Sequence, residues 1–188
     1  NSQADVLIEA RRAADLLKAT PLDRPEDVEP NPVNGRVYVM LTNNSQRTGG
    51  PGTANGPDEA NPRNGNKHGH ILAIAEKHND AASESFTWSL PIVCGDPKDA
   101  STYFTGYDKT KVSPISCPDN VAFDKAGNLW ISTDGNALGS NDGLFATPVA
   151  GPEAGHVKQF LTVPKGAETC GPFITPDQKS VFVAVQHP

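Results

Sequence analysis

An internal repeat is the feature that most limits what this chain can fold into. Three segments share one layout: a polar turn, a short strand, a turn rich in Pro, Asp or Gly, and a strong apolar strand that ends in polar residues. They are "RPEDVEPNPVNGRVYVMLTNN", "CPDNVAFDKAGNLWISTDGN" and "ETCGPFITPDQKSVFVAVQHP". Between the second and the third, "GLFATPV" and "HVKQFLTV" supply two more strands. Four antiparallel strands in roughly 50 residues are typical of a propeller blade.

The repeat therefore predicts an all-β chain, with residues 1–188 forming one partial β-propeller domain. We expect about two and a half four-stranded blades, at about 24–93, at 117–164, and opening again at 168. The alternative is a self-contained antiparallel sandwich, which explains the repeat less well. Propellers usually need at least four blades to close. We therefore expect the rest of a longer propeller, or another copy of the chain, to complete the sheets.

The segment before the repeat predicts one amphipathic helix over residues 4–19, "ADVLIEARRAADLLKA". Its apolar residues follow helical spacing at Val6, Ala10, Ala13 and Leu17. Ser2 and Asp5 form a variant of the capping box, which places the helix start at Ser2. The chain has no initiating Met and no signal peptide, so we expect a processed or fragmentary chain. Two polar loops rich in Gly and Pro, at 44–69 and 95–114, are long enough to be functional or mobile.

Charge and composition exclude several classes of function. A net charge of −6 argues against nucleic acid and anionic membranes as partners. No stretch approaches the ~20 apolar residues of a membrane span. Cys94, Cys117 and Cys170 lack a CxxC pair, which excludes a zinc ribbon; buried free thiols are expected, and one disulfide plus a free thiol is the alternative. The sequence has no P-loop, GxGxxG, GxSxG or HExxH motif.

The repeat also predicts where functional side chains gather. In a propeller, the turns that precede the innermost strands open on one face of the central channel. The turns that converge there carry Arg24, Glu26, Asp27 and Glu29 from the first unit, Asp119 and Asn120 from the second, and Glu168 and Thr169 from the third. The polar clusters that end the second strands should rim the same face; they are Asn43 with Asn44, Asp134 with Asn136, and Gln186 with His187. Glu168 falls about two positions earlier than Glu26 and Asp119 when the strands are aligned.

Carboxylates from three blades repel one another at a shared axis, so a bound cation is the natural compensation. Ligands that are all oxygen suit a hard ion such as Ca²⁺, Mg²⁺, Mn²⁺ or Fe³⁺. Arg24 beside them suits a phosphate or carboxylate group. The alternatives are that these acidic residues are solvated turn formers and that Arg24 pairs with Asp23 or Asp27. His68, His70 and His187 are interpreted as structural.

At "RPEDVEPNPVNGRVYVMLTNN" the sequence resembles the PhoX family of bacterial alkaline phosphatases. Later landmarks keep the family order: "ANPRNGNKHGHI", "FTWSLPIVCGDP", "CPDNVAFDKAGNLWISTDGN" and "GAETCGPFITPDQKSVFVAVQHP". The resemblance runs from about residue 5 to the end and covers what would be the C-terminal part of a longer protein. It implies a six-bladed propeller that hydrolyses small phosphate monoesters with Fe³⁺ and Ca²⁺. It also implies export to the periplasm or the exterior.

The resemblance assigns roles residue by residue. Arg24 matches the family arginine that contacts phosphate, and Glu26 matches a carboxylate metal ligand. Asp119 falls where the family aspartate binds metal, although Asn120 stands where the family usually has Gly. Glu168 matches the glutamate of a "CEVTG"-like turn.

The N-terminal half of the family, with a cysteine ligand to iron and other acidic ligands, has no counterpart in this chain. We therefore expect an incomplete metal cluster and little or no phosphatase activity from the isolated chain. Two other functions stay open at this point. One is a Ca²⁺-dependent lactonase propeller of the gluconolactonase type, and the other is a non-catalytic binding propeller.

Overall fold

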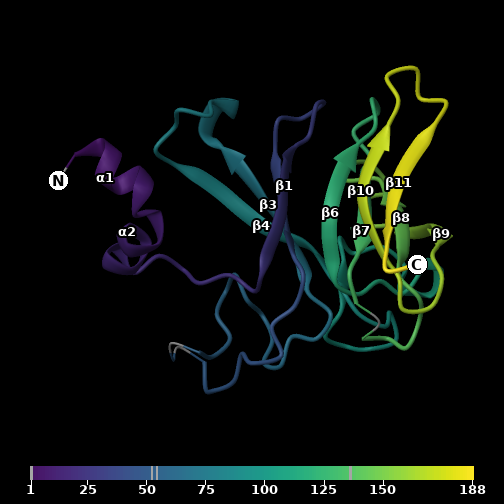
Figure 1. Ribbon diagram of the computed structural model, residues 1–188, viewed down its shortest axis with the longest axis horizontal. Helices are drawn as coiled ribbons and strands as arrows, with labels where there is room; N and C mark the ends of the chain where they lie inside the picture. Colours follow the sequence, from purple (N-terminus) through teal and green to yellow (C-terminus); the bar gives the residue numbers. More distant parts are fainter. Residues whose placement is uncertain (1, 52, 54, 136) are drawn as a thin grey trace.

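The computed structural model describes residues 2–51, 53, 55–135 and 137–188 (Figure 1). The described residues are mostly β, with eleven strands in three antiparallel sheets, which confirms the all-β prediction. The number of blades in a complete propeller stays a prediction. Two short 3₁₀ turns, η1 (Lys77–Asn79) and η2 (Lys109–Lys111), interrupt the connections.

The first sheet has five strands in sequence order. They are β1 (Pro25–Pro30), β2 (Val37–Leu41), β3 (His70–Glu76), β4 (Phe86–Val93) and β5 (Tyr103–Phe104). The prediction gave this unit four strands and left 95–114 as a loop. The fifth strand forms because Tyr103 and Phe104 pair with Val93 and Ile92, and this pairing lets Phe104 bury its ring almost completely.

The second sheet has four strands and the third has two, both again in sequence order. The second contains β6 (Pro118–Phe123), β7 (Leu129–Thr133), β8 (Gly143–Thr147) and β9 (Lys158–Thr162). The third contains β10 (Glu168–Ile174) and β11 (Val181–Gln186). The blade boundaries stay a prediction, and β5 lies between the first two predicted units.

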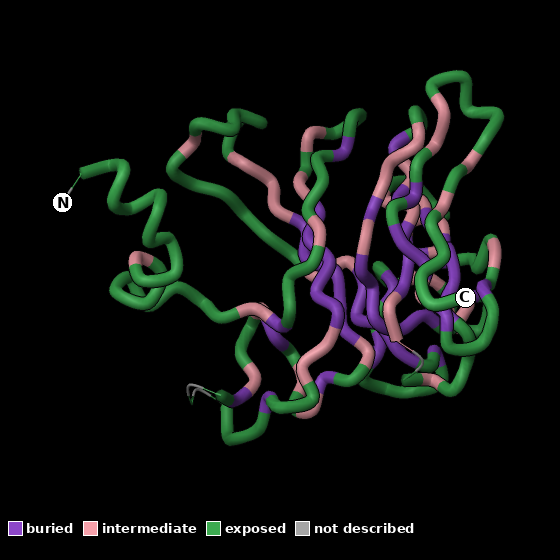
Figure 2. The backbone as a smooth tube through the Cα atoms, viewed as in Figure 1, coloured by how far each residue is buried: buried purple, intermediate pink, exposed green. Residues whose placement is uncertain are grey.

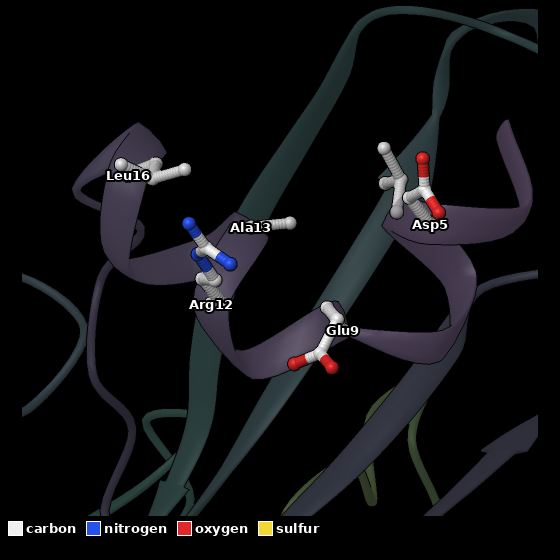
Figure 3. A pocket seen from close by; sticks show the side chains of 6 residues that line it. Asp5, Glu9, Arg12, Ala13 and Leu16 are labelled. Atoms are coloured by element: carbon white, nitrogen blue, oxygen red, sulfur yellow. The ribbon is translucent and has the colours of Figure 1, made fainter. Parts of the chain in front are cut away.

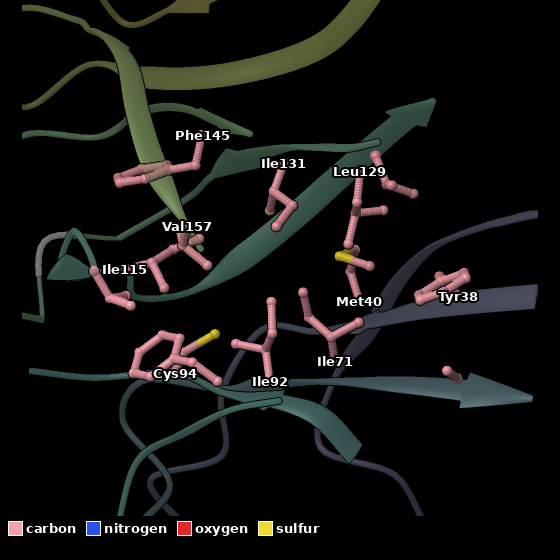
Figure 4. Packing of buried hydrophobic residues seen from close by; sticks show 14 residues of the cluster. Tyr38, Met40, Ile71, Ile92, Cys94, Ile115, Leu129, Ile131, Phe145 and Val157 are labelled. Carbon is pink, nitrogen blue, oxygen red and sulfur yellow. The ribbon is translucent and has the colours of Figure 1, made fainter. Parts of the chain in front are cut away.

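The main core lies between the first two sheets, where apolar side chains from both meet (Figure 4). Met40 and Ile71 from the first sheet face Leu129 and Ile131 from the second, and all four are fully buried. Each fully buried aliphatic side chain contributes roughly 1.5–3 kcal/mol. Buried residues are concentrated in this middle region, as Figure 2 shows. This packing sets the relative positions of the strands that carry the candidate site.

The first strands of the three sheets, β1, β6 and β10, lie side by side (Figure 1). Side chains tie them together. Asp27 Oδ2 accepts a hydrogen bond from Val121 N at 2.9 Å, and Asn120 Oδ1 accepts one from Gly171 N at 2.9 Å. Thr42, which follows β2, donates its hydroxyl to Pro118 O at 2.9 Å. The turns that precede these strands are therefore brought to one region of the molecule.

The helix predicted over residues 4–19 is two helices, α1 (Gln3–Ile8) and α2 (Ala10–Leu17). The Ser2–Asp5 capping box is present as predicted. The helix breaks at Glu9, where φ is −101° and ψ is 40°. Neither helix buries a residue, so no tertiary packing opposes the break. A shallow pocket along this pair, lined by Asp5, Val6, Glu9, Arg12, Ala13 and Leu16, includes none of the candidate residues (Figure 3).

In the part of the chain that the structure describes, no helix has the length and apolar character needed to span a membrane.

Candidate functional site

Arg24 and Cys117 occupy equivalent positions directly before β1 and β6. Arg24 O accepts a hydrogen bond from Thr42 N at 3.1 Å, and Cys117 O accepts one from Asp134 N at 3.1 Å. Both residues have a positive φ, 46° for Arg24 and 55° for Cys117. Left-handed backbone costs a residue with a side chain roughly 1–2 kcal/mol. Strain of this kind persists only where the surrounding contacts fix the backbone.

A β-bulge follows each of these turns and sets the direction of the acidic side chains. In the first sheet Pro25 pairs with Leu41 and Asp27 with Met40, so Glu26 is the extra residue. In the second sheet the register shifts between Pro118 and Val121, around Asp119. In the third sheet the shift comes later, after Cys170, so Glu168 lies before its bulge. Glu168 is therefore not placed as Glu26 and Asp119 are.

The guanidinium of Arg24 is held by two side chains. Its Nη2 lies 2.8 Å from Glu26 Oε1, and its Nη1 donates to Asn43 Oδ1 at 3.4 Å. The Arg24 side chain is 50% exposed, which leaves it accessible to a ligand. The alternative pairing of Arg24 with Asp23 or Asp27 is wrong. Asp23 is buried against Arg47, and Asp27 accepts hydrogen bonds from the backbone N–H groups of Val28 and Val121.

Asn43 also reaches the second sheet. Its Nδ2 donates to Cys117 Sγ at 3.6 Å, while its Oδ1 accepts from Arg24. One side chain therefore connects the two left-handed positions. Burial raises the pKa of the Cys117 thiol, so this sulfur is held as a neutral thiol rather than a thiolate.

Asp119 carries the clearest electrostatic signal among the candidate residues. The residue is only 7% exposed, and its pKa is raised from 3.8 to about 6. Burial is the largest cause, followed by the charges of Asp134, Glu26 and Glu168, while Arg24 opposes the shift. Carboxylates from all three sheets therefore act on Asp119, and a single guanidinium partly offsets them. This is the convergence that the repeat predicted.

Glu168 is held in place by two neighbours within the third sheet. Its Oε1 accepts hydrogen bonds from Gln186 Nε2 at 3.1 Å and from Cys170 Sγ at 3.4 Å. Beside it, the hydroxyl of Thr169 is buried without a hydrogen-bond partner in the described structure. Glu168 is thus oriented by side chains that belong to its own strand pair.

A polar pocket of about 350 Å³ opens beside Glu168, between the second and third sheets. Its lining includes Asp134, Asp142, Lys165, Glu168 and His187. The predicted rim residues Asp134 and His187 are therefore found at the candidate site, whereas Asn136 lies outside the described residues. Sequence reasoning missed Asp142 and Lys165, because an Asp or Lys next to Gly in a turn gives no distinguishing signal.

Asp142 supports the loop that follows β7. It accepts hydrogen bonds from Thr133 Oγ1 at 2.7 Å and from Gly135 N at 3.0 Å. Burial raises the pKa of Asp142, and the charge of Asp134 contributes to the same shift. Asp142 and Asp134 therefore lie close enough for their charges to interact.

The donor set suits a hard cation in its chemistry, because Glu26, Asp119 and Glu168 offer only oxygen atoms. The raised pKa of Asp119 also indicates negative charge that the protein does not fully neutralise. Within the described ranges, however, no group of three or more His, Cys, Asp or Glu side chains is close enough to hold a metal ion. The residues present therefore match a cation in type and in charge but do not by themselves form a coordination sphere.

His68, His70 and the cysteines have structural environments. His70 is buried between Asn66 and Ala60, and His68 contacts the Ser116 hydroxyl at 3.1 Å. Cys94, Cys117 and Cys170 are all buried free thiols. Burial raises the pKa of Cys94 to about 12, which makes it unreactive.

The chain matches the family model described as alkaline phosphatase PhoX over residues 1–188. Among solved structures it is similar to Pseudomonas fluorescens PhoX in complex with vanadate, a transition state analogue, with a TM-score of 0.82 and 39% sequence identity. That match covers 100% of this chain and 33% of the other, so this chain spans about a third of its length. No curated protein matches.

A gluconolactonase from Xanthomonas campestris is also found among solved structures. It is 13% identical with a TM-score of 0.33, and the match covers 88% of this chain and 55% of the other. A likeness this low carries no argument about fold or function.

Proposed function

This chain belongs to the alkaline phosphatase PhoX family, and from that premise we propose that the whole protein is a metal-dependent phosphatase that hydrolyses small phosphate monoesters. The observation that carries the proposal is the convergence of Arg24 with the carboxylates around Asp119. It combines a half-exposed guanidinium with one buried carboxyl, Asp119, and with the more exposed carboxylates whose charges act on it. A phosphoryl group needs cationic partners for its oxygens, such as a guanidinium fork and metal ions, and carboxylates can hold those metal ions.

Arg24 is proposed to hold the phosphate group of the substrate. A guanidinium presents two parallel N–H donors to two phosphate oxygens, and this fixes the orientation as well as the position of the group. The contacts of Arg24 with Glu26 and Asn43 restrict its rotation before substrate arrives. Less side-chain freedom is then lost on binding.

Glu26, Asp119 and Glu168 are proposed to hold the metal ions, with the remaining ligands supplied by parts of the whole protein outside this chain. The identities proposed are Ca²⁺ and Fe³⁺. Metal ions at such a site stabilise negative charge on the phosphoryl oxygens and activate an oxygen nucleophile. Gln186 donates to Glu168 Oε1 at 3.1 Å and so restricts the orientation of that carboxylate.

We further propose a periplasmic or secreted location and small phosphate esters as the substrates. The open edges of the sheets, for example β11 in the two-stranded sheet, are proposed to pair with the rest of the propeller or with another copy of the chain. Monomeric behaviour of the 188-residue chain in light scattering would count against pairing between copies.

The experiment compares the whole protein with its Glu26→Gln variant, by metal analysis and by hydrolysis of p-nitrophenyl phosphate. We expect bound calcium and iron in the wild type, inhibition by inorganic phosphate, and loss of both metal and activity in the variant. Glu29→Gln is the matched control, because Glu29 is an exposed carboxylate on the same strand. Lactone hydrolysis without phosphate inhibition would favour the lactonase. Absence of metal, with stability unchanged by EDTA, would favour a binding propeller.

A further inference from the structure

Asp23, the residue before Arg24, is a fully buried carboxylate that accepts three side-chain hydrogen bonds. Its Oδ1 accepts from Arg47 Nε at 2.6 Å and from Asn44 Nδ2 at 2.9 Å. Its Oδ2 accepts from Asn66 Nδ2 at 2.9 Å. Arg47 is itself only 4% exposed. A buried ion pair whose remaining lone pairs are satisfied in this way holds its neighbours in one arrangement.

Side chains of the polar segment 44–66, which contains Arg47 and Asn61, also fix the backbone on both sides of Leu22. Arg47 Nη2 and Asn61 Nδ2 each donate to Pro21 O at 3.0 Å. Asn61 Oδ1 accepts from Asp23 N at 3.1 Å. The turn that follows closes with Arg24 N donating to Leu22 O at 3.0 Å. The backbone that leads into the left-handed Arg24 is therefore held by side chains of the 44–66 loop.

Asp23 and Arg24 are neighbours in sequence, and so are Asn44 and Asn43. One residue of each pair lies in the buried network and the other lies at the candidate site. Asp23 and Asn44 bind each other in the buried network. Arg24 and Asn43 bind each other at the site. Arg24 follows Asp23 directly in the chain, and Asn43 directly precedes Asn44. Holding the Asp23–Asn44 pair in place therefore restricts where the backbone places Arg24 and Asn43.

We propose that Asp23, with Arg47 as its buried counter-ion, is a positioning residue that holds Arg24 in the orientation that binds the phosphate group. This inference rests on the proposed function, in which Arg24 contacts phosphate. The proposal gives the polar segment 44–66 a role in the candidate site. Asn44 is the one residue of this segment that is next in sequence to a residue of the site, Asn43. If the role of Asp23 were purely structural, replacing it would lower the stability of the protein without changing its affinity for phosphate.

The test uses the whole protein and its Asp23→Asn variant, with p-nitrophenyl phosphate as substrate and inorganic phosphate as inhibitor. We expect KM and the inhibition constant of phosphate to rise together by about tenfold, with a smaller change in kcat. Arg47→Lys should act in the same direction. If Asp23→Asn fails to fold, Asn44→Ala carries the same comparison, because it removes one donor and keeps the ion pair.

Asn31→Ala is the matched control. Asn31 is a buried side chain just beyond the other end of β1, where it donates to Gly127 O at 2.9 Å. We expect this variant to lower the melting temperature and to leave KM and the inhibition constant unchanged. The inference is overturned if folded Asp23→Asn keeps both constants within twofold of the wild type. It is also overturned if Asn31→Ala raises them equally.

A crystal structure of the Asp23→Asn protein separates this inference from the proposed function. We expect residue 24 to leave its φ of 46° or its side chain to lose contact with Asn43. An unchanged Arg24 would overturn the positioning role, whatever the activity. By contrast, an Arg24→Lys variant with unaltered phosphate inhibition would overturn the role of Arg24 in the proposed function.

Discussion

Asn43 connects Arg24 to Cys117, and so joins the equivalent turns of two neighbouring sheets. Its amide oxygen lies 3.4 Å from Arg24 Nη1 and its amide nitrogen 3.6 Å from Cys117 Sγ. Both partners have a left-handed backbone, so this one side chain spans the two strained positions. The connection explains why an asparagine at the end of β2 belongs to the candidate site.

Replacing Asn43 should weaken phosphate binding. Asn43→Ala removes the amide oxygen that orients the Arg24 guanidinium, and a hydrogen bond to a charged group contributes roughly 1.5–3 kcal/mol at most. Because the contact is long, we expect the inhibition constant of inorganic phosphate to rise by about threefold to tenfold. Asn34→Ala, at an exposed turn, is the control. Equal constants for Asn43→Ala and the wild type would contradict the connection.

The raised pKa of Asp119 predicts that ionising this carboxyl lowers the free energy of unfolding of the metal-free chain as the pH rises. In the folded state the carboxyl stays protonated up to about pH 6, whereas its ordinary pKa is 3.8. The stability it contributes is fully present below about pH 4 and is lost as the pH rises through 6. Asp119→Asn should therefore stabilise the metal-free chain at pH 8 by up to about 3 kcal/mol and have little effect near pH 4.

Urea denaturation of the chain in EDTA at the two pH values measures this difference. In the whole protein, adding Ca²⁺ at pH 8 should stabilise the wild type and leave Asp119→Asn unchanged. Glu29→Gln, which removes an exposed charge, is the control. A stability gain for Asp119→Asn that is the same at both pH values would count against the electrostatic explanation.

His70 predicts a loss of stability in acid. Asn66 Nδ2 can only donate, so His70 Nδ1 accepts at 3.0 Å, and Nε2–H donates to Ala60 O at 2.7 Å. This arrangement requires the neutral ring, and burial lowers the pKa of His70 below 6.5. The stability from the neutral ring is present above pH 6.5 and is lost as the pH falls.

Thermal unfolding of the chain between pH 5 and pH 8 tests this expectation. His70→Gln should be less stable at pH 8 and should lose less stability on acidification than the wild type. His78→Asn, at an exposed position, should show the same change of melting temperature with pH as the wild type. If His70→Gln also shows the wild-type change of melting temperature with pH, another group is responsible.

The 188-residue chain by itself should have little or no phosphatase activity. It matches a third of the solved PhoX chain, and its described residues gather no group of three metal-ligating side chains. We expect turnover of p-nitrophenyl phosphate at the background rate, with or without added Ca²⁺ and Fe³⁺. The whole protein is the positive control. Robust metal-dependent turnover by the isolated chain would refute the prediction.

The sequence predicted the strands and the turns because both depend on local patterns. Apolar runs bounded by Gly, Pro, Asn and Asp are found as β2, β3, β7 and β8. The repeat also predicted that Arg24, Glu26, Asp119 and Glu168 come from turns that converge, and the strands that follow these turns, β1, β6 and β10, lie side by side. The helix over residues 4–19 was predicted less well, because its periodicity does not reveal that nothing packs against it.

The choice of partner for each polar side chain depends on the tertiary structure. "DRPEDVEP" offers Arg24 several carboxylates within a few positions, and the sequence cannot rank them. The fold buries Asp23 against Arg47 and Asn66, a residue 43 positions away, and directs Asp27 to the second sheet. Glu26 is left at a bulge beside Arg24. Periodicity along the chain thus determined the strands and the region of the candidate site, whereas long-range burial decided which charges lie in the buried network and which stay exposed.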